Sequence, residues 1–173
     1  VRQRSIVEPS GRSHAALMQD KLVAVAGATG KLGRLLIESL LAHPGVTVRA
    51  LVRDPEKAES RALASERVEL FRFDAVAATE AERQAAVRGT FAVVSALQGG
   101  PDVIVDAQIA LLRAAKSAGA RRFIPSDYSY NIFTLPEGIN VNSDWRRALA
   151  TLADEEATGT FEVVHVLQGI FAD

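Results

Sequence analysis

Three glycines at three-residue spacing follow a short apolar run, and this combination is suited to binding phosphate. The run covers residues 22–26, and an amphipathic segment follows at residues 32–41. Gly27 permits a tight turn, Gly30 permits a close approach of the backbone to a pyrophosphate, and Gly33 permits close packing of helix on strand. The first N–H groups of such a helix lack partners within it, and its dipole favours an anion. The pattern predicts a strand, a phosphate-binding turn and a helix; a glycine-rich turn without a ligand is the alternative.

A cation stands at the end of the second predicted strand, where the two nicotinamide dinucleotides are distinguished. An NAD-preferring site usually has Asp or Glu there, but this chain has Arg53. A guanidinium suits a 2′-phosphate through forked, charge-assisted hydrogen bonds, and Lys57 would add a second positive charge one helical turn later. We therefore expect NADP(H) as the preferred cofactor. NAD(H) is the alternative, because the adjacent Asp54 could bind a ribose; a solvated arginine and a surface lysine are the structural readings of the two cations.

Two further polar residues follow or occupy predicted strands. Asp74, at the end of the third strand, could accept a hydrogen bond from an adenine amino group or cap the next helix. His165 lies on the last strand, near the expected cleft, and is a candidate catalytic acid. A lone histidine on an apolar strand is also commonly a core or edge residue with its hydrogen bonds satisfied.

The composition excludes several classes of function. The 173 residues suffice for one domain, and the net charge of −1 gives no footprint for nucleic acid. No cysteine occurs and the three histidines lie far apart, so we expect no metal site. We see no signal peptide and no apolar run that could span a bilayer, so we expect a cytoplasmic protein without membrane contact. Residues 1–17 are expected to form a flexible polar arm before a domain of residues 18–173, with Met18 as the natural start.

Strands and helices alternate along the domain. Strands are predicted at residues 22–26, 46–52, 68–73, 91–97, 122–125 and 161–167, and helices at residues 32–41, 55–65, 79–87, 102–118 and 143–156. Thr79 and Glu82 form a capping-box pattern, Gly119 ends a helix, and Ser143 or Asp144 is expected to cap the last one. The alternation predicts a doubly wound, parallel six-stranded α/β sheet of Rossmann type, with strand order 3-2-1-4-5-6.

Three motifs resemble one family of dinucleotide-binding proteins. These are GATGKLG at residues 27–33, ALVRDP at residues 50–55, and DAQIALLRAAKSAGARRFIPSDY at residues 106–128. They look like the NmrA-like, isoflavone-reductase-like branch of the atypical short-chain dehydrogenases. The resemblance implies an NAD(P)H-binding domain followed by a small C-terminal substrate lobe, and either reductase activity or cofactor-sensing regulation. The chain ends just after the sixth strand, so we expect that lobe to be missing.

The resemblance also implies which residues contact the cofactor. The residues that it carries over are Gly27, Thr29, Gly30, Lys31, Leu32, Gly33, Arg53, Ser95, Leu97 and Ser126. Gln108 matches a family glutamine, for which polar packing is the alternative role, and Asp127 matches the end of the fifth strand under the nicotinamide.

The chain departs from the family where a reductase needs a proton donor. Family reductases resemble one another in a lysine after the fifth strand, but no lysine follows Lys116. The Tyr-x-x-x-Lys pair is also absent, because Ile132 lies four places after Tyr128. Tyr128 is still a candidate donor, although nothing visible would lower its pKa from about 10, and an aromatic filling the pocket floor is its other role.

Three functions follow from these observations. The first is NADPH-dependent reduction of a small conjugated carbonyl, quinone or aromatic compound. The second is a non-catalytic NADP(H) sensor that acts through a protein partner, and the third is a cofactor-binding fragment that is inactive alone. A homodimer is a candidate assembly for any of them.

Overall fold

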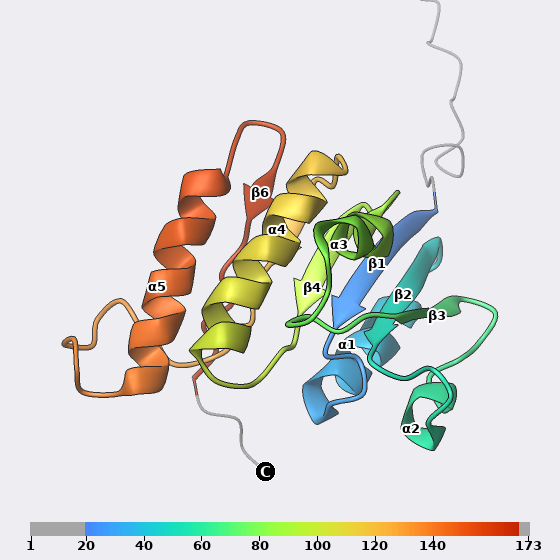
Figure 1. The fold of residues 1–173 in the computed structure, drawn as a ribbon, viewed down its shortest axis with the longest axis horizontal. Coiled ribbons are helices and arrows are strands. Elements are labelled where there is room, and N and C mark those ends of the chain that lie inside the picture. The colour runs from blue at the N-terminus through green and yellow to red at the C-terminus, as the bar shows by residue number, and fades with distance from the viewer. Residues whose placement is uncertain (1–19, 170–173) are drawn as a thin grey trace, which may run out of the picture.

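The fold is a six-stranded parallel sheet, as predicted. The computed structural model describes residues 20–169, so the expected arm at residues 1–17 lies outside the described part. The strands are β1 (Lys21–Ala26), β2 (Val46–Val52), β3 (Val68–Arg72), β4 (Ala92–Ser95), β5 (Arg122–Ile124) and β6 (Glu162–Val163). Their order is β3-β2-β1-β4-β5-β6, and every neighbouring pair is parallel. The doubly wound order 3-2-1-4-5-6 is therefore confirmed (Figure 1).

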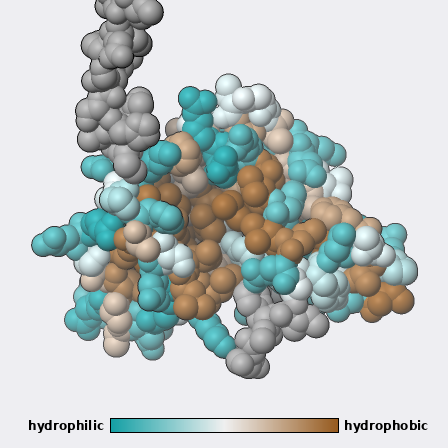
Figure 2. All heavy atoms as spheres, turned by 180° about the vertical axis from the view of Figure 1, so that it is seen from behind, coloured by the Kyte–Doolittle hydropathy of each residue, from teal (hydrophilic) through white to brown (hydrophobic). Residues whose placement is uncertain are grey.

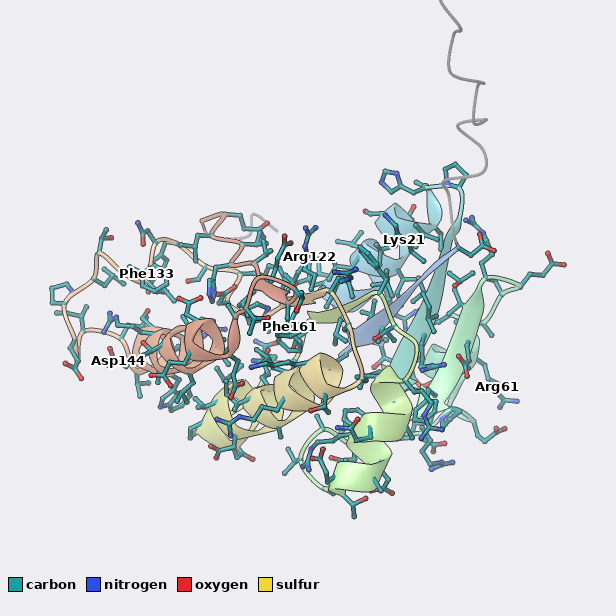
Figure 3. The ribbon with its side chains drawn as sticks, turned by 90° about the horizontal axis from the view of Figure 1, so that it is seen from above. Lys21, Arg61, Arg122, Phe133, Asp144 and Phe161 are labelled. Atoms are coloured by element: carbon teal, nitrogen blue, oxygen red, sulfur yellow. The ribbon has the colours of Figure 1, made fainter. Side chains whose placement is uncertain are left out.

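Helices cover both faces of this sheet. They are α1 (Lys31–Leu41), α2 (Ala58–Arg61), α3 (Glu80–Val87), the π-helix η2 (Asp102–Ala107), α4 (Gln108–Ser117) and α5 (Val141–Glu156). Helices α3, α4 and α5 lie on one face and α1 lies on the other (Figures 1 and 3). None of the helices between residues 20 and 169 has the length and apolar character needed to cross a bilayer.

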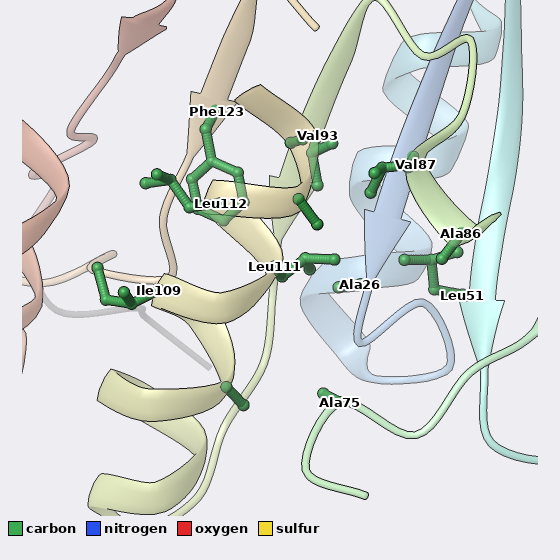
Figure 4. Packing of buried hydrophobic residues seen from close by; sticks show 14 of the residues in the cluster. Ala26, Leu51, Ala75, Ala86, Val87, Val93, Ile109, Leu111, Leu112 and Phe123 are labelled. Atoms are coloured by element: carbon green, nitrogen blue, oxygen red, sulfur yellow. The ribbon is translucent and has the colours of Figure 1, made fainter. Parts of the chain in front are cut away.

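Alternate residues of β1 divide the core into two clusters. Ala24 and Ala26 face the cluster that contains Leu111 of α4 (Figure 4), whereas Val23 and Val25 face the cluster of α1. Both faces of the strand are buried, which explains its continuous apolar sequence. On the α1 side, Figure 2 shows hydrophobic side chains gathered in the middle of the surface, and several hydrophobic residues that pack against this cluster are only partly buried.

The helix ends confirm two predictions and correct one. Thr79 and Glu82 form the capping box, and Gly119 has the positive φ of 81° that suits a residue after a helix. The prediction that Ser143 or Asp144 caps the last helix is wrong. Asn140 caps it, because its side chain accepts a hydrogen bond from the N–H of Asn142 at 2.9 Å.

Several elements are shorter than the sequence indicates. Only Glu162–Val163 of the predicted last strand is paired as β6, because the N–H of Val166 donates to the Asp127 carboxylate at 3.4 Å instead of to a strand. Leu167 then forms an isolated bridge with Ser129. The predicted polar helix at residues 55–65 is reduced to α2. The predicted helix at residues 102–118 begins as the π-helix η2, a form that is often found at functional sites.

Candidate functional site

A cleft of about 300 Å³ lies at the carboxyl edge of the sheet. The ends of β1, β2, β3 and β4 contribute its walls. This is the edge where β1 and β4 are neighbours and the chain changes from one face to the other, which is the usual ligand site of a doubly wound sheet. The cleft brings together these predicted residues: Gly27, Thr29, Gly30, Arg53, Asp74 and Leu97.

The three glycines differ in what the protein itself requires. Gly27 has a φ of +76°, and a Cβ atom there would stand 2.5 Å from the carbonyl oxygen of Ala96. A Cβ atom on Gly33 would stand 2.2 Å from the carbonyl oxygen of Gly27. Gly30 has a φ of −70°, and a Cβ atom there would meet Gly27 at an ordinary 3.4 Å. The fold therefore requires glycine at positions 27 and 33. At position 30 the fold would accept a side chain, and glycine keeps the cleft open there.

Helix α1 starts directly at this cleft. Its N-cap is Gly30, which has no side chain to satisfy the N–H groups of the first turn, where Lys31, Leu32 and Gly33 lie. The turn before it is closed by the N–H of Gly30, which donates to the Gly27 carbonyl at 3.1 Å. An uncapped helix N-terminus beside a cleft is suited to an anionic ligand.

Arg53 and Lys57 share a second cleft of about 260 Å³, which Thr29 also lines. Arg53 lines both clefts, so the two spaces adjoin at this residue. Both cationic side chains are exposed, and neither has an ion pair or hydrogen bond within residues 20–169. The two charges are thus available at the end of β2.

Asp54 is held by neighbouring groups. Its Oδ1 atom accepts a hydrogen bond from the N–H of Glu56 at 3.1 Å and lies 3.7 Å from Nη2 of Arg72. Arg72 ends β3 and, with Arg53, lines a third cleft of about 290 Å³. The sequence reading missed Arg72, although its place two residues before Asp74 at a strand end was a usable signal.

Arg34 ties the glycine turn to α2. Its Nε atom donates to the carbonyl of Thr29 at 3.0 Å, and its Nη2 atom donates to the carbonyl of Glu59 at 3.1 Å. Thr29 and Glu59 both line the cleft of Lys57. Arg34 therefore positions two walls of that cleft. Sequence reasoning missed this role, because the two acceptors are backbone carbonyls that spacing does not reveal.

Asp74 organises the turn after β3. Its Oδ1 atom accepts hydrogen bonds from the N–H groups of Val76 at 3.0 Å and Ala77 at 3.1 Å. The helix-capping alternative for Asp74 is wrong, since Thr79 caps α3. Asp74 lines the cleft of about 300 Å³, and its contact with an adenine stays a prediction.

Ser95 and Ser126 support the segment of Leu97. Ser126 donates through its hydroxyl to the carbonyl of Leu97 at 2.7 Å, and the N–H of Leu97 donates to Oγ of Ser95 at 3.5 Å. Both serines are buried. Gln108, also buried, accepts a hydrogen bond from the N–H of Ser126 at 2.8 Å. These hydrogen bonds hold the segment that follows β4 in place. Of these four residues, Leu97 lines the cleft.

His165 is held between two carboxylates. Its Nδ1 atom pairs with the fully buried Asp127, and its Nε2 atom lies 3.0 Å from Oδ1 of Asp154 on α5. The hydrogen bond with Asp127 is the main cause that raises the pKa of His165, with desolvation opposing it. Phe133 packs edge-on against the ring, on the side of the molecule far from α2 (Figure 3).

Tyr128 has a buried hydroxyl with no hydrogen-bond partner among the described residues. Burial, followed by the charge of Asp127, raises its pKa well above the ordinary value. Such a phenol holds its proton more tightly than a free tyrosine. Among the residues that line the three clefts described above, neither Tyr128 nor His165 occurs.

The sheet order and the cleft at its switch point define a Rossmann-type domain. A model of the NmrA-like family matches residues 19–134, and the chain belongs to this family. The comparison with curated proteins gave no match.

Solved structures show the same fold at low sequence identity. AtPrR2 with NADP⁺ and (+)pinoresinol is 22% identical with a TM-score of 0.67, over 88% of this chain and 51% of its own. Leucoanthocyanidin reductase of Vitis vinifera with NADPH is 23% identical with a TM-score of 0.66, over 84% and 47%. NmrA, a negative transcriptional regulator in complex with NADP, is 20% identical with a TM-score of 0.70, over 86% and 45%. The chain thus spans about half the length of these structures.

Proposed function

We propose that this chain binds NADP(H) at the carboxyl edge of its sheet, in preference to NAD(H). The observation that carries this proposal is the cleft of Arg53 and Lys57, which adjoins the glycine turn. A 2′-phosphate gains charge-assisted hydrogen bonds from a guanidinium, and a nearby ammonium adds a second attraction. Asp54, the group that would favour a ribose hydroxyl, is engaged by Glu56 and Arg72.

Each part of the dinucleotide has an assigned set of residues in this proposal. The pyrophosphate lies against the turn and first helical residues, Gly27, Thr29, Gly30, Lys31, Leu32 and Gly33. Arg53 and Lys57 bind the 2′-phosphate and Asp74 faces the adenine. Leu97 lies beside the nicotinamide ribose, with Ser95 and Ser126 beneath it. NAD(H) lacks the 2′-phosphate, so it is the weaker ligand.

We further propose that the protein takes part in the reduction of a small conjugated carbonyl, quinone or aromatic compound. The cofactor supplies the hydride, while the protein orients the cofactor and shields the reaction from water. Membership of a family whose fold is shared with leucoanthocyanidin reductase and AtPrR2 supports this proposal.

A second candidate function is an NADP(H) sensor that acts through a protein partner. The environments of the two candidate proton donors favour it. Tyr128 has a raised pKa in a buried site, and His165 is held between Asp127 and Asp154. The fold shared with NmrA, a negative transcriptional regulator, supports this use as well.

Calorimetric titration of the chain with NADPH, NADP⁺ and NADH tests the proposal. We expect both phosphorylated cofactors to bind more tightly than NADH, because only they carry the 2′-phosphate. Equal affinities for NADPH and NADH would reject the assigned preference, and no heat with any of them would reject binding itself. Turnover of NADPH with a panel of quinones and enones would identify a reductase. Binding without turnover fits a sensor or a cofactor-binding fragment, and a protein partner captured only in the presence of NADP(H) would identify the sensor.

A further inference from the structure

Arg72 lies beside the two residues that follow β2, Arg53 and Asp54. Val52 and Arg72 are partners in the parallel pairing of β2 with β3, so the two strand ends are adjacent. The Nη1 atom of Arg72 donates to the carbonyl of Arg53 at 3.4 Å, and its Nη2 atom lies 3.7 Å from Oδ1 of Asp54. One guanidinium thus contacts the backbone of the expected phosphate-binding residue and the carboxylate beside it.

The cleft shared by Arg72 and Arg53 also contains two carboxylates, and both are already engaged. Asp74 accepts the two N–H groups of the turn after β3. Glu82 accepts hydrogen bonds from the N–H and the hydroxyl of Thr79 in the capping box. Asp54 and Glu59 line the adjoining cleft of Lys57, and Asp54 has Arg72 as its charged partner. The negative charge that Asp54 brings to this subsite is therefore offset by Arg72.

We propose that Arg72 is a specificity-determining residue, which selects NADP(H) over NAD(H) by neutralising Asp54 and adding positive charge at the 2′-phosphate subsite. The inference rests on the proposed function. An uncompensated Asp54 would repel a 2′-phosphate and would be free to accept hydrogen bonds from ribose hydroxyls. Pairing with Arg72 opposes both effects without any contact between Asp54 and the phosphate.

The ion pair is suited to such a role because it contributes little to folding. The side chains of Arg72 and Asp54 are 68% and 39% exposed, and ion pairs in such exposed sites add little stability. Arg72 can therefore be replaced without unfolding the domain. Its effect should appear in the affinity for the phosphorylated cofactor, which places a new anion next to the pair.

The test compares Arg72→Gln, Asp54→Asn and the double variant by calorimetry with NADPH and NADH. We expect Arg72→Gln to weaken NADPH about fivefold, the size of a single exposed charge interaction, and to leave NADH unchanged or tighter. In the Asp54→Asn background the loss on NADPH should be smaller, because residue 54 then carries no charge for Arg72 to neutralise. Arg121→Gln is the matched control. It removes an exposed arginine just before β5, where the strands begin, whereas the clefts lie where the strands end, and it should change neither affinity.

Three results would overturn the inference. These are equal losses for NADPH and NADH, a loss no larger than that of Arg121→Gln, and an undiminished loss in the Asp54→Asn background. Thermal unfolding of Arg72→Gln, expected to match wild type, shows that a lost affinity is not a lost fold. If wild type binds no dinucleotide, the proposed function fails; if Arg53→Ala removes the preference and Arg72→Gln keeps it, only this inference fails.

Discussion

Gly33 lies against the backbone of Gly27 with no room for a side chain. A Cβ atom on Gly33 would stand 2.2 Å from the carbonyl oxygen of Gly27 and 2.9 Å from Cα of Ala28. Both obstacles are backbone atoms, so no rotamer change can relieve the contact. Helix α1 can pack this closely on the turn that follows β1 only because this residue is glycine.

We expect Gly33→Ala to destabilise the domain and Gly30→Ala to leave its stability unchanged. The first variant forces α1 away from the turn, an overpacking that costs about 1–3 kcal/mol. The second adds a methyl group at an allowed φ of −70° and an ordinary contact distance, but places it in the cleft. Gly30→Ala should therefore bind NADPH more weakly.

Urea unfolding and calorimetry on both variants measure these two effects separately. Unchanged stability of Gly33→Ala would show that α1 moves without cost. Full NADPH affinity in Gly30→Ala would show that the pyrophosphate does not approach this residue.

The sequence was sufficient to predict the sheet and the glycine turn, because both depend on local pattern. Continuous apolar runs and glycine spacing predicted β1 and its turn, and the alternation of elements predicted the strand order. The capping box of Thr79 and Glu82 is local as well, since its residues are three apart.

Contacts between distant segments could not be read in this way. Arg34 reaches the carbonyl of Glu59, and Asp127 pairs with a histidine 38 residues later. The cap of α5 was misplaced because Asn140, Ser143 and Asp144 are all good capping residues. The partners of the side chains decide among them: Oγ of Ser143 lies 3.1 Å from the hydroxyl of Tyr130, and Asp144 pairs with Arg147 on its own helix.

The pairing of His165 with Asp127 should make stability depend on pH. The folded state raises the pKa of His165, so the protonated form is stabilised by folding. This contribution is complete below the ordinary histidine pKa of about 6.5 and is lost as the pH rises through the raised value. The stability advantage of wild type over His165→Asn should therefore shrink as the pH rises above the ordinary value of about 6.5.

Urea unfolding at a series of pH values measures that advantage, with His43→Asn as the control for an exposed histidine. At low pH we expect His165→Asn to lose up to about 3–5 kcal/mol, because it leaves the charge of the buried Asp127 without its partner. A constant difference across the range would contradict the role of the protonated histidine.

Tyr128→Phe should fold at least as well as wild type. The hydroxyl that it removes is buried without a hydrogen-bond partner among the described residues, and such a group costs about 1–3 kcal/mol. We expect an increase in stability of about 1 kcal/mol and no change in NADPH affinity. Thermal unfolding and calorimetry measure the two quantities. A loss of NADPH turnover in this variant, where wild type shows turnover, would instead identify the phenol as a proton donor.

Arg53→Ala should separate the two dinucleotides most clearly. Arg53 follows β2 and lines both the cleft of the glycine turn and the cleft of Lys57. Loss of its guanidinium therefore removes charge-assisted hydrogen bonds to a 2′-phosphate. We expect NADPH to lose about 1.5–3 kcal/mol of binding free energy and NADH to change little. Arg61→Ala is a matched control, since Arg61 is an exposed arginine on α2 (Figure 3). Calorimetric titration of both variants with both cofactors makes the comparison, and an equal loss for NADPH and NADH would remove Arg53 from the 2′-phosphate subsite.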